Sequence, residues 1–310
     1  IPALAQPIAF PDQFDPIGTP LQSLQTREGR TVHFTDTGEA GWTPMLFIGG
    51  VGTSARAPEL VAFLDTLRRR LKVRIIAVER NGLGDTAFDP AWTFDDYTSE
   101  VRQVLAQLGV QRFALVAISG GGAYAGHIAA AMPERVTSWH MLAAIASAPP
   151  TSPVCTADQA TLEAGLAQQV GAPRQFWAMP KDGVAGKVPG FIDRAADEGA
   201  HAYFIAGQRG DARGVAREYR RFCDAPAPVA AFPAPAFFYY GEADTLSDLN
   251  RIAPGLIGLD PFALNALTQV VYRCVGNNPD IGAAFPPQGD KARASALGAF
   301  EVAFWDLQGQ

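Results

Sequence analysis

The segment from residue 113 to residue 132 constrains the fold more than any other part of the sequence. A run of apolar strand formers at 113–118 leads directly into Ser-Gly-Gly-Gly at 119–122, and an alanine-rich helical stretch follows. This order predicts a strand, a sharp turn with a serine at its apex, and a helix. Such a turn needs small neighbours, because a serine at the apex has a strained backbone and larger side chains would clash. The geometry exposes the Ser119 hydroxyl and leaves the Gly120 N–H near the helix N-terminus, free to bind an oxyanion.

Strands and helices alternate along the first 146 residues. The expected strands are short apolar runs, and the expected helices carry apolar residues on one face. Thr93, followed by Asp95 and Asp96, is a typical N-cap, and Gly109 ends the helix that it begins. The alternation predicts a mostly parallel sheet covered on both faces by helices. The expected elements are a hairpin at 24–26 and 31–37, strands at 45–48, 73–78, 113–118 and 136–145, and helices at 58–71, 93–108 and 121–132.

The pattern changes between residues 147 and 233. This stretch is rich in Ala, Gly, Arg and aromatic residues, and it has helical segments but no obvious strand. We interpret it as a helical cap inserted into one α/β core, which consists of residues 1–146 and 234–310. The alternation then resumes, with strands expected at 236–240 and 269–275 and a closing helix at 291–307.

The three cysteines, Cys155, Cys223 and Cys274, are far apart and odd in number. They form neither a metal-binding spacing nor a disulfide framework. Cys155 and Cys223 both fall in the predicted cap, where a single bridge is one alternative. Buried free thiols are the simpler interpretation.

The charge and composition exclude several function classes. With a net charge of −6 over 310 residues, the chain lacks the basic surface typical of nucleic-acid or anionic-membrane binding. No apolar run approaches the ~18 residues of a membrane span. No phosphate loop, dinucleotide fingerprint or metal cluster is recognisable, so we expect no cofactor and a small-molecule substrate as the partner. The chain begins at Ile1, which suggests trimming or processing of a protein that is either cytoplasmic or secreted after signal removal.

Two further segments are expected to place functional groups near the serine. Gly-Gly-Val-Gly at 49–52 follows an early strand, and glycines there let the backbone approach a substrate. The Val51 N–H, paired with that of Gly120, would complete an oxyanion hole. Asp244 follows the strand at 236–240, at the end where open α/β sheets place functional groups. The structural alternatives are a turn serine at 119, a plain glycine-rich turn at 49–52, and a helix N-cap at Asp244.

Several motifs together resemble a large bacterial branch of α/β-hydrolases. The sequences Ser-Gly-Gly-Gly-Ala-Tyr-Ala at 119–125 and Met-Pro-Glu-Arg-Val at 132–136 are similar to its elbow and following helix. Glu-Arg-Asn-Gly-Leu-Gly at 79–84 resembles its Asp-Arg-Pro-Gly-x-Gly loop, and residues 49–52 resemble its His-Gly-x-Pro-Gly loop without the histidine. Gly-Glu-Ala-Asp at 241–244 matches its acid turn. The resemblance covers residues 22–145 and 215–250, and it implies the α/β-hydrolase fold, a nucleophilic Ser119 and an oxyanion hole.

The catalytic histidine of that family has no counterpart here. It should follow the last strand, but none of the four histidines lies beyond residue 201. His33 and His140 fall in predicted strands, and His127 follows Ser119 on the same helix, about 12 Å away at a rise of about 1.5 Å per residue. His201, in the predicted cap, is the remaining candidate for a substitute base. The loop after the last strand offers other polar partners instead, namely Asn277, Asn278 and Asp280.

These residues predict a serine-dependent ester, lactone or thioester hydrolase with an atypical triad. Ser119 would attack, and Asp244 would support the group that takes its proton. A lyase or cyclase using the same oxyanion pocket, or a non-catalytic ligand-binding protein on the same scaffold, is the alternative. Aromatic residues in the cap indicate a largely apolar substrate chamber, although they also fit simple packing of the cap onto the core. The expected pocket residues are Gly50, Phe176, Trp177, Tyr203 and Phe204, with Phe191 and Phe222 among the other aromatics of the cap.

Overall fold

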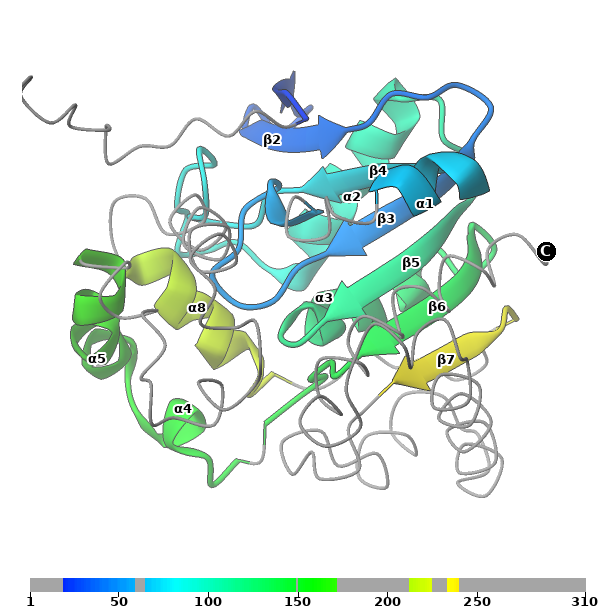
Figure 1. Cartoon of the computed structure of the whole chain (residues 1–310). Helices are drawn as coiled ribbons and strands as arrows, with labels where there is room; N and C mark the ends of the chain where they lie inside the picture. The colour runs from blue at the N-terminus through cyan, green and yellow to red at the C-terminus, as the bar shows by residue number, and fades with distance from the viewer. Residues whose placement is uncertain (1–18, 59–64, 149, 172–211, 225–232, 240–310) are drawn as a thin grey trace, which may run out of the picture.

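The computed structural model describes residues 19–58, 65–148, 150–171, 212–224 and 233–239, with only the backbone described at 168–171. Seven strands form one sheet in the order β1-β2-β4-β3-β5-β6-β7 (Figure 1). Strands β1 and β2 pair antiparallel, and β2 pairs antiparallel with β4. All the other pairs are parallel. The strands are β1 (Leu21–Gln25), β2 (Thr31–Asp36), β3 (Thr43–Ile48), β4 (Val73–Val78), β5 (Phe113–Ile118), β6 (Val136–Leu142) and β7 (Ala236–Tyr239).

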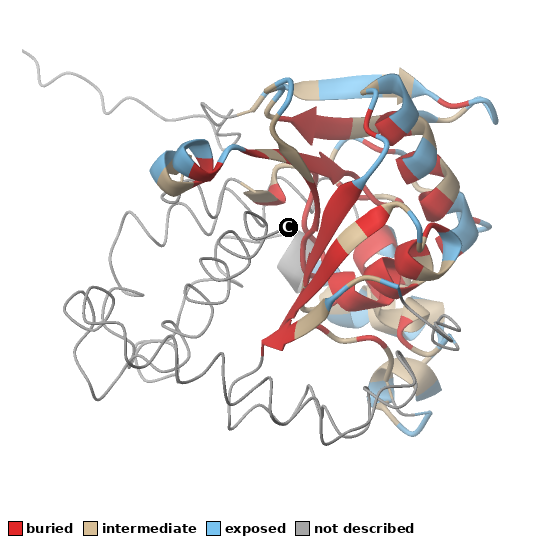
Figure 2. Cartoon of the chain, turned by 90° about the vertical axis from the view of Figure 1, so that its right-hand side faces the viewer, coloured by how far each residue is buried: buried red, intermediate tan, exposed pale blue. Residues whose placement is uncertain are grey.

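Helices cover both faces of the sheet, as the alternation of elements predicts. Alternate residues of β3 belong to two separate apolar cores: Leu46 and Ile48 pack with α2 and α3, whereas Met45 and Phe47 pack on the face that holds Leu71 of α1. Figure 2 shows the central strands buried between these layers. The helices are α1 (Asp65–Leu71), α2 (Phe94–Gln107), α3 (Gly121–Ala131), α4 (Pro153–Thr156), α5 (Gln159–Gly171) and α8 (Arg213–Arg221).

Local sequence signals explain where α2 begins and ends. The Thr93 side chain accepts the Asp96 N–H at 3.2 Å, and the Asp96 carboxylate accepts the Thr93 N–H at 2.8 Å. This reciprocal pair is a capping box, which satisfies N–H groups that have no partner inside the helix. After the helix, Gly109 has a φ of 67°, a left-handed conformation that favours glycine.

Strand β6 ends earlier than the sequence pattern predicts, at Leu142 rather than at residue 145. Ala143 has a φ of 43° and turns the chain out of the sheet. The turn brings the Ile145 N–H to the Ser119 carbonyl at 2.7 Å. The end of β6 is therefore set by contacts around the serine turn, which an apolar run does not reveal.

Cys155 and Cys223 form a disulfide, with Cα atoms 5.5 Å apart. The interpretation of these two residues as free thiols is therefore wrong. The bond joins Cys155 in α4 to Cys223, which lies two residues after the end of α8. The two cysteines are 68 positions apart in the sequence. The third cysteine, Cys274, lies outside the described residues.

Three described helices, α4, α5 and α8, fall within residues 147–233. The expected division into core and cap extends beyond the described residues and stays a prediction, as do the strand at 269–275 and the helix at 291–307. Among the helices that are described, none combines the length and apolar character needed to cross a membrane. The same part of the chain contains no cluster of side chains suited to hold a metal ion.

Candidate active site

Ser119 lies at the apex of a sharp turn between β5 and α3. Its φ is 49°, and its side chain is half-buried at the carboxyl end of a central strand. Three backbone hydrogen bonds fix the turn: the Ser119 N–H donates to Leu142 O at 3.2 Å, and Ser119 O accepts the N–H groups of Gly122 and Ile145 at 3.1 and 2.7 Å. Neighbouring chain segments thus hold a conformation that residues with a side chain rarely adopt.

The segment Gly49–Thr53 follows β3 and lies against the serine; we call it the oxyanion loop after the role that the sequence predicts for it. A Cβ built on Gly50 would lie 3.3 Å from Ser119 Cβ and 3.7 Å from Ser119 Oγ. A Cβ built on Gly120 would lie 3.3 Å from the Val51 backbone nitrogen. The sequence therefore needs glycine at both positions to let the two backbones approach this closely.

The backbone N–H groups of Val51 and Gly120 have no acceptor among the described residues. They belong to neighbouring segments beside the Ser119 side chain. Two free N–H donors next to a serine are what binding of an oxyanion requires. Chemically, the arrangement suits attack on a carbonyl whose oxygen becomes negatively charged.

Arg80 lies two residues after β4 and contacts the oxyanion loop. It exposes only 2% of its surface, and its guanidinium donates to three loop carbonyls: Gly49 O at 3.2 Å, Gly50 O at 2.7 Å and Thr53 O at 3.3 Å. The guanidinium carbon also lies 5.2 Å from the centre of the Tyr124 ring, in a cation–π contact.

Glu218 of α8 is the counter-ion of Arg80. It also exposes 2% of its surface, and its Oε1 accepts a hydrogen bond from Arg80 Nε. Its Oε2 accepts the Gly52 N–H at 2.7 Å. Burial lowers the pKa of Arg80, but the Glu218 carboxylate more than offsets this and holds that pKa above its ordinary value. The buried cation is therefore paired as well as hydrogen-bonded.

Helix α8 lies beyond the carboxyl ends of the central strands (Figure 1). At its start, Gly214 meets Gly82 so closely that a Cβ on Gly82 would lie 3.0 Å from Gly214 Cα. Just past its end, the ring of Phe222 approaches Gly120, where it would overlap an added Cβ. Phe222 O accepts the Ala148 N–H at 2.6 Å. Residues far apart in the sequence thus meet at Ser119.

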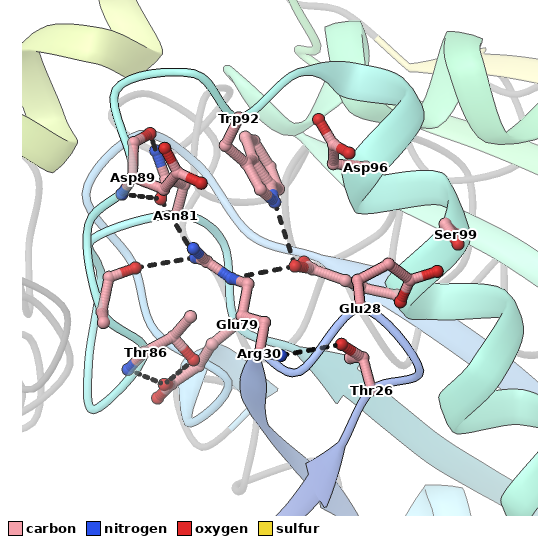
Figure 3. A network of polar contacts seen from close by, with 12 residues as sticks. Thr26, Glu28, Arg30, Glu79, Asn81, Thr86, Asp89, Trp92, Asp96 and Ser99 are labelled. Carbon is pink, nitrogen blue, oxygen red and sulfur yellow. Dashed lines mark hydrogen bonds and ion pairs between the residues drawn. The ribbon is translucent and has the colours of Figure 1, made fainter.

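The loop that carries Arg80 is held by its own buried contacts (Figure 3). Glu79 accepts the Asp85 N–H at 2.9 Å, and both the N–H and the hydroxyl of Thr86 at 3.0 Å. Burial raises the pKa of Glu79 to about 7, although these hydrogen bonds favour the ionised form. The loop therefore turns tightly around the Glu79 carboxylate.

Arg30 ties the same loop to the first hairpin and to α2 (Figure 3). Its Nε forms an ion pair with Glu100 Oε1 at 2.9 Å, and its Nη2 donates to Asn81 Oδ1 at 3.0 Å. Trp92 Nε1 donates to the same Glu100 oxygen at 3.0 Å. Asn81 also bonds both the N–H and the carbonyl of Asp89, at 2.8 Å each. A proline, which the resembled motif has in this position, has no side chain that could make these bonds.

Solved structures with similar folds include hydrolytic enzymes. A carboxylesterase from the thaumarchaeon Nitrososphaera gargenis superimposes with a TM-score of 0.61 at 18% identity, covering 85% of this chain and 99% of the other. A hydrolase from Pseudomonas aeruginosa PA01 gives 0.59 at 18% identity, with coverages of 94% and 98%. Epoxide hydrolase A from Mycobacterium thermoresistibile gives 0.56 at 17% identity, with coverages of 78% and 88%. The chain has the α/β-hydrolase fold. No family sequence model and no curated protein sequence matches it.

In this α/β-hydrolase fold, each of the three described histidines contacts groups other than the serine. His140 is fully buried and bonded to Tyr239 Oη at 3.1 Å and Ser138 Oγ at 3.0 Å, and burial lowers its pKa to about 3. His127 stacks on Phe94 with ring centres 4.1 Å apart. His33 contacts Thr86 Oγ1 at 3.2 Å.

Most of the other expected site residues lie outside the described residues. They are the expected acid, the candidates for base or polar partner, and the aromatic pocket: Asp244, His201, Asn277, Asn278, Asp280, Phe176, Trp177, Tyr203 and Phe204. Within the described part of the chain, no polar side chain makes a hydrogen bond to Ser119 Oγ.

Sequence reasoning missed Arg80 and Glu218. Glu218 carried one usable signal, because it falls three residues after Val215 and four before Phe222, on the apolar face of a helix. A carboxylate on an apolar face needs a buried partner. Nothing in the sequence names Arg80 as that partner, since the two residues are 138 positions apart.

Proposed function

We propose that this protein is an enzyme that uses Ser119 to attack the carbonyl carbon of a largely apolar small molecule. The observation that supports this most is the half-buried serine at a φ of 49°, beside two backbone N–H groups without an acceptor in the described residues. Strained residues persist where the surrounding structure enforces them, and they gather at active sites. The carboxylesterase and epoxide hydrolase neighbours agree with a hydrolytic use of the fold, although the fold alone does not decide the chemistry.

The proposed reaction is hydrolysis of an ester, lactone or thioester. Ser119 Oγ bonds to the carbonyl carbon and gives up its proton, while the N–H groups of Val51 and Gly120 hold the oxyanion. The bond to the leaving oxygen or sulfur then breaks, and that atom takes a proton. Water next attacks the acyl-serine, which releases the carboxylic acid and restores the hydroxyl.

The proton acceptor is the unusual part of the proposal. A serine hydroxyl stays protonated near neutral pH, and losing its base typically costs on the order of 10⁴–10⁶ in rate. We infer that the reaction does not use a Ser–His relay. Asp280 or a basic group of the substrate would take the proton, Asp244 would support that group, and Asn277 and Asn278 would position a water or a substrate group. His201 is the one histidine that could contradict this inference.

Two other functions stay open because no described side chain bonds Ser119 Oγ. The first is an elimination or cyclisation in the same pocket, which would use the oxyanion site without an acyl-enzyme. The second is ligand binding without catalysis. Both predict that Ser119 does not become covalently modified during the natural process.

A fluorophosphonate probe separates these functions. We expect labelling of wild-type protein and none of Ser119→Ala, whereas Ser99→Ala, at a half-buried serine of α2, serves as the matched control and should be labelled normally. Turnover of activated esters should be slow and Ser119-dependent. Fast turnover that rises near the pKa of a histidine and is lost in His201→Ala would contradict the proposed mechanism. Absence of both labelling and turnover would contradict the proposed hydrolysis and favour one of the two other functions.

A further inference from the structure

We propose that Arg80 and Glu218 are positioning residues that fix the two peptide planes on either side of Val51, and so aim its N–H at the oxyanion. This proposal deepens the proposed function and rests on it for its catalytic consequence. Its structural content concerns the oxyanion loop alone. It can therefore be tested whether or not Ser119 proves to be a nucleophile.

The first plane joins Gly50 to Val51. It contains the Gly50 carbonyl and the Val51 N–H, which point in opposite directions because no described peptide bond is cis. Arg80 Nη2 donates to Gly50 O at 2.7 Å. The carbonyl is thus held toward the buried cation, and the Val51 N–H must point away from it. Thr53 Oγ1 donates to the same carbonyl at 2.7 Å, so rotating this plane would break the hydrogen bonds that both Arg80 and Thr53 make to Gly50 O.

The second plane joins Val51 to Gly52. Its N–H, on Gly52, donates to Glu218 Oε2 at 2.7 Å, so the Val51 carbonyl points away from the carboxylate. The same carboxylate bonds Arg80 through Oε1. One buried ion pair therefore contacts both peptide planes, and rotating either plane would break a hydrogen bond to a charged group.

A purely stabilising role explains this pair less well. A buried ion pair is weak evidence for stability, since desolvation of two charges offsets much of their attraction. The Arg80 guanidinium instead donates hydrogen bonds to backbone carbonyls of one loop, at Gly49, Gly50 and Thr53. Preorganised N–H donors are effective because they need no reorientation when charge develops.

Glu218 also connects α8 to this function. Gly214 and Phe222, at the two ends of the helix, pack on Gly82 and Gly120. The disulfide at Cys223 holds the residues just after α8 to Cys155. The packing of α8 against the core therefore also determines where Glu218 lies and how the Val51 N–H is oriented.

The test replaces both charges by apolar residues of similar size, in the double variant Arg80→Met/Glu218→Leu of the full chain. Such a replacement usually preserves folding. We expect hydrogen exchange of the Gly52 amide, measured by NMR, to accelerate at least about tenfold. We expect kcat for an activated ester to fall about 10²-fold with KM nearly unchanged, because the loss is in transition-state binding.

A second buried ion pair provides the matched control. Arg74 and Asp36 pair at 2.6 Å between β4 and β2, with 13% and 5% of their side chains exposed and no contact to the oxyanion loop. The variant Arg74→Met/Asp36→Leu should leave both Gly52 exchange and kcat unchanged.

Two results would overturn the proposal: a folded Arg80→Met/Glu218→Leu protein with wild-type exchange at Gly52, or one with wild-type kcat where the wild type turns over esters. If that double variant does not fold, Glu218→Gln decides by the same two measurements. An inactive wild type would refute the proposed function, and the exchange measurement would still decide the role of the ion pair.

Discussion

A methyl group on Gly120 would overlap the side chain of Val51 and lie 3.3 Å from its backbone nitrogen. It would also overlap the ring of Phe222. Gly120→Ala should therefore push the oxyanion loop away from Ser119. We expect a loss of about 10²-fold in Ser119-dependent kcat, comparable to losing one oxyanion donor. Overpacking should also lower the free energy of unfolding by about 1–3 kcal/mol, measured by urea titration.

Gly165→Ala is the matched control for that variant. Gly165 is an exposed residue of α5, and an added Cβ there meets no atom within 4 Å. Alanine should be neutral or stabilise the helix by up to about 1 kcal/mol. A Gly120→Ala protein as active as Gly165→Ala would contradict the close contact between Gly120 and Val51.

Reduction of the disulfide should destabilise the protein. The bridge between Cys155 and Cys223 spans 68 positions, and closing a loop of that length contributes about 4 kcal/mol in the chain-entropy model. Thermal unfolding with and without reductant measures the effect. Cys155→Ser should match the reduced wild type and no longer respond to reductant, whereas Cys274→Ser should respond as the wild type does.

Glu79 should make the protein less stable as the pH rises from about 5 to 8. Its folded pKa is about 7, against an ordinary value of 4.5, so between these values the native state binds more protons than the unfolded state. The free energy of unfolding should fall across this window by about 3 kcal/mol. His33 Nδ1 lies 3.8 Å from Glu79 Oε2, and the nearby charge of Asp85 adds to the rise of the Glu79 pKa.

Urea titrations at pH 5 and pH 8 measure this contribution. Glu79→Gln should remove the contribution of Glu79 and flatten the pH dependence. The part due to Glu100 should remain, because burial raises the pKa of Glu100 to about 7 as well. Glu28→Gln is the control, because Glu28 is exposed and hydrogen bonding lowers its pKa, which places its titration below this window. Equal slopes for Glu79→Gln and the wild type would refute the assignment.

His140 should have the opposite effect at lower pH. Burial lowers its folded pKa to about 3 from 6.5, so below pH 6.5 the unfolded state binds a proton that the native state does not. Stability should be lost as the pH falls from 6.5 toward 3, by about 4 kcal/mol in total. His140→Gln retains polar groups for Tyr239 and Ser138 and should lose less stability between pH 6.5 and pH 4. An unchanged acid loss would show that His140 takes up a proton in the folded protein.

The strands and helices of the described core were predictable because each is encoded locally. The apolar run at 113–118, the Thr93 cap and the glycine after α2 act within a few residues, and all appear as expected. The serine turn was predictable from Ser-Gly-Gly-Gly after a strand, although hydrogen bonds to Leu142 and Ile145 also hold it. The end of β6 was mispredicted because a contact from Ile145 to Ser119 decides it, and this contact depends on the completed sheet.

The long-range contacts that hold the candidate site could not be predicted in the same way. Arg80 and Glu218 meet across 138 positions, and the disulfide closes 68. Neither pairing follows from spacing or composition, since each depends on how α8 docks. A buried charge in a motif such as Glu-Arg-Asn-Gly at 79–82 indicates only that a partner exists somewhere in the fold.

The placement of Glu218 limits the modularity of this chain. Cutting out residues 147–233 and rejoining the ends would remove the only described counter-ion of a cation that exposes 2% of its surface. Leaving such a charge uncompensated typically costs about 3–5 kcal/mol, a large share of the stability of an ordinary domain. The segment 147–233 is therefore not an accessory that can be deleted without loss. Any shortened version of this protein that keeps Arg80, or any chimera with a foreign segment in this place, must supply a carboxylate where Glu218 now stands.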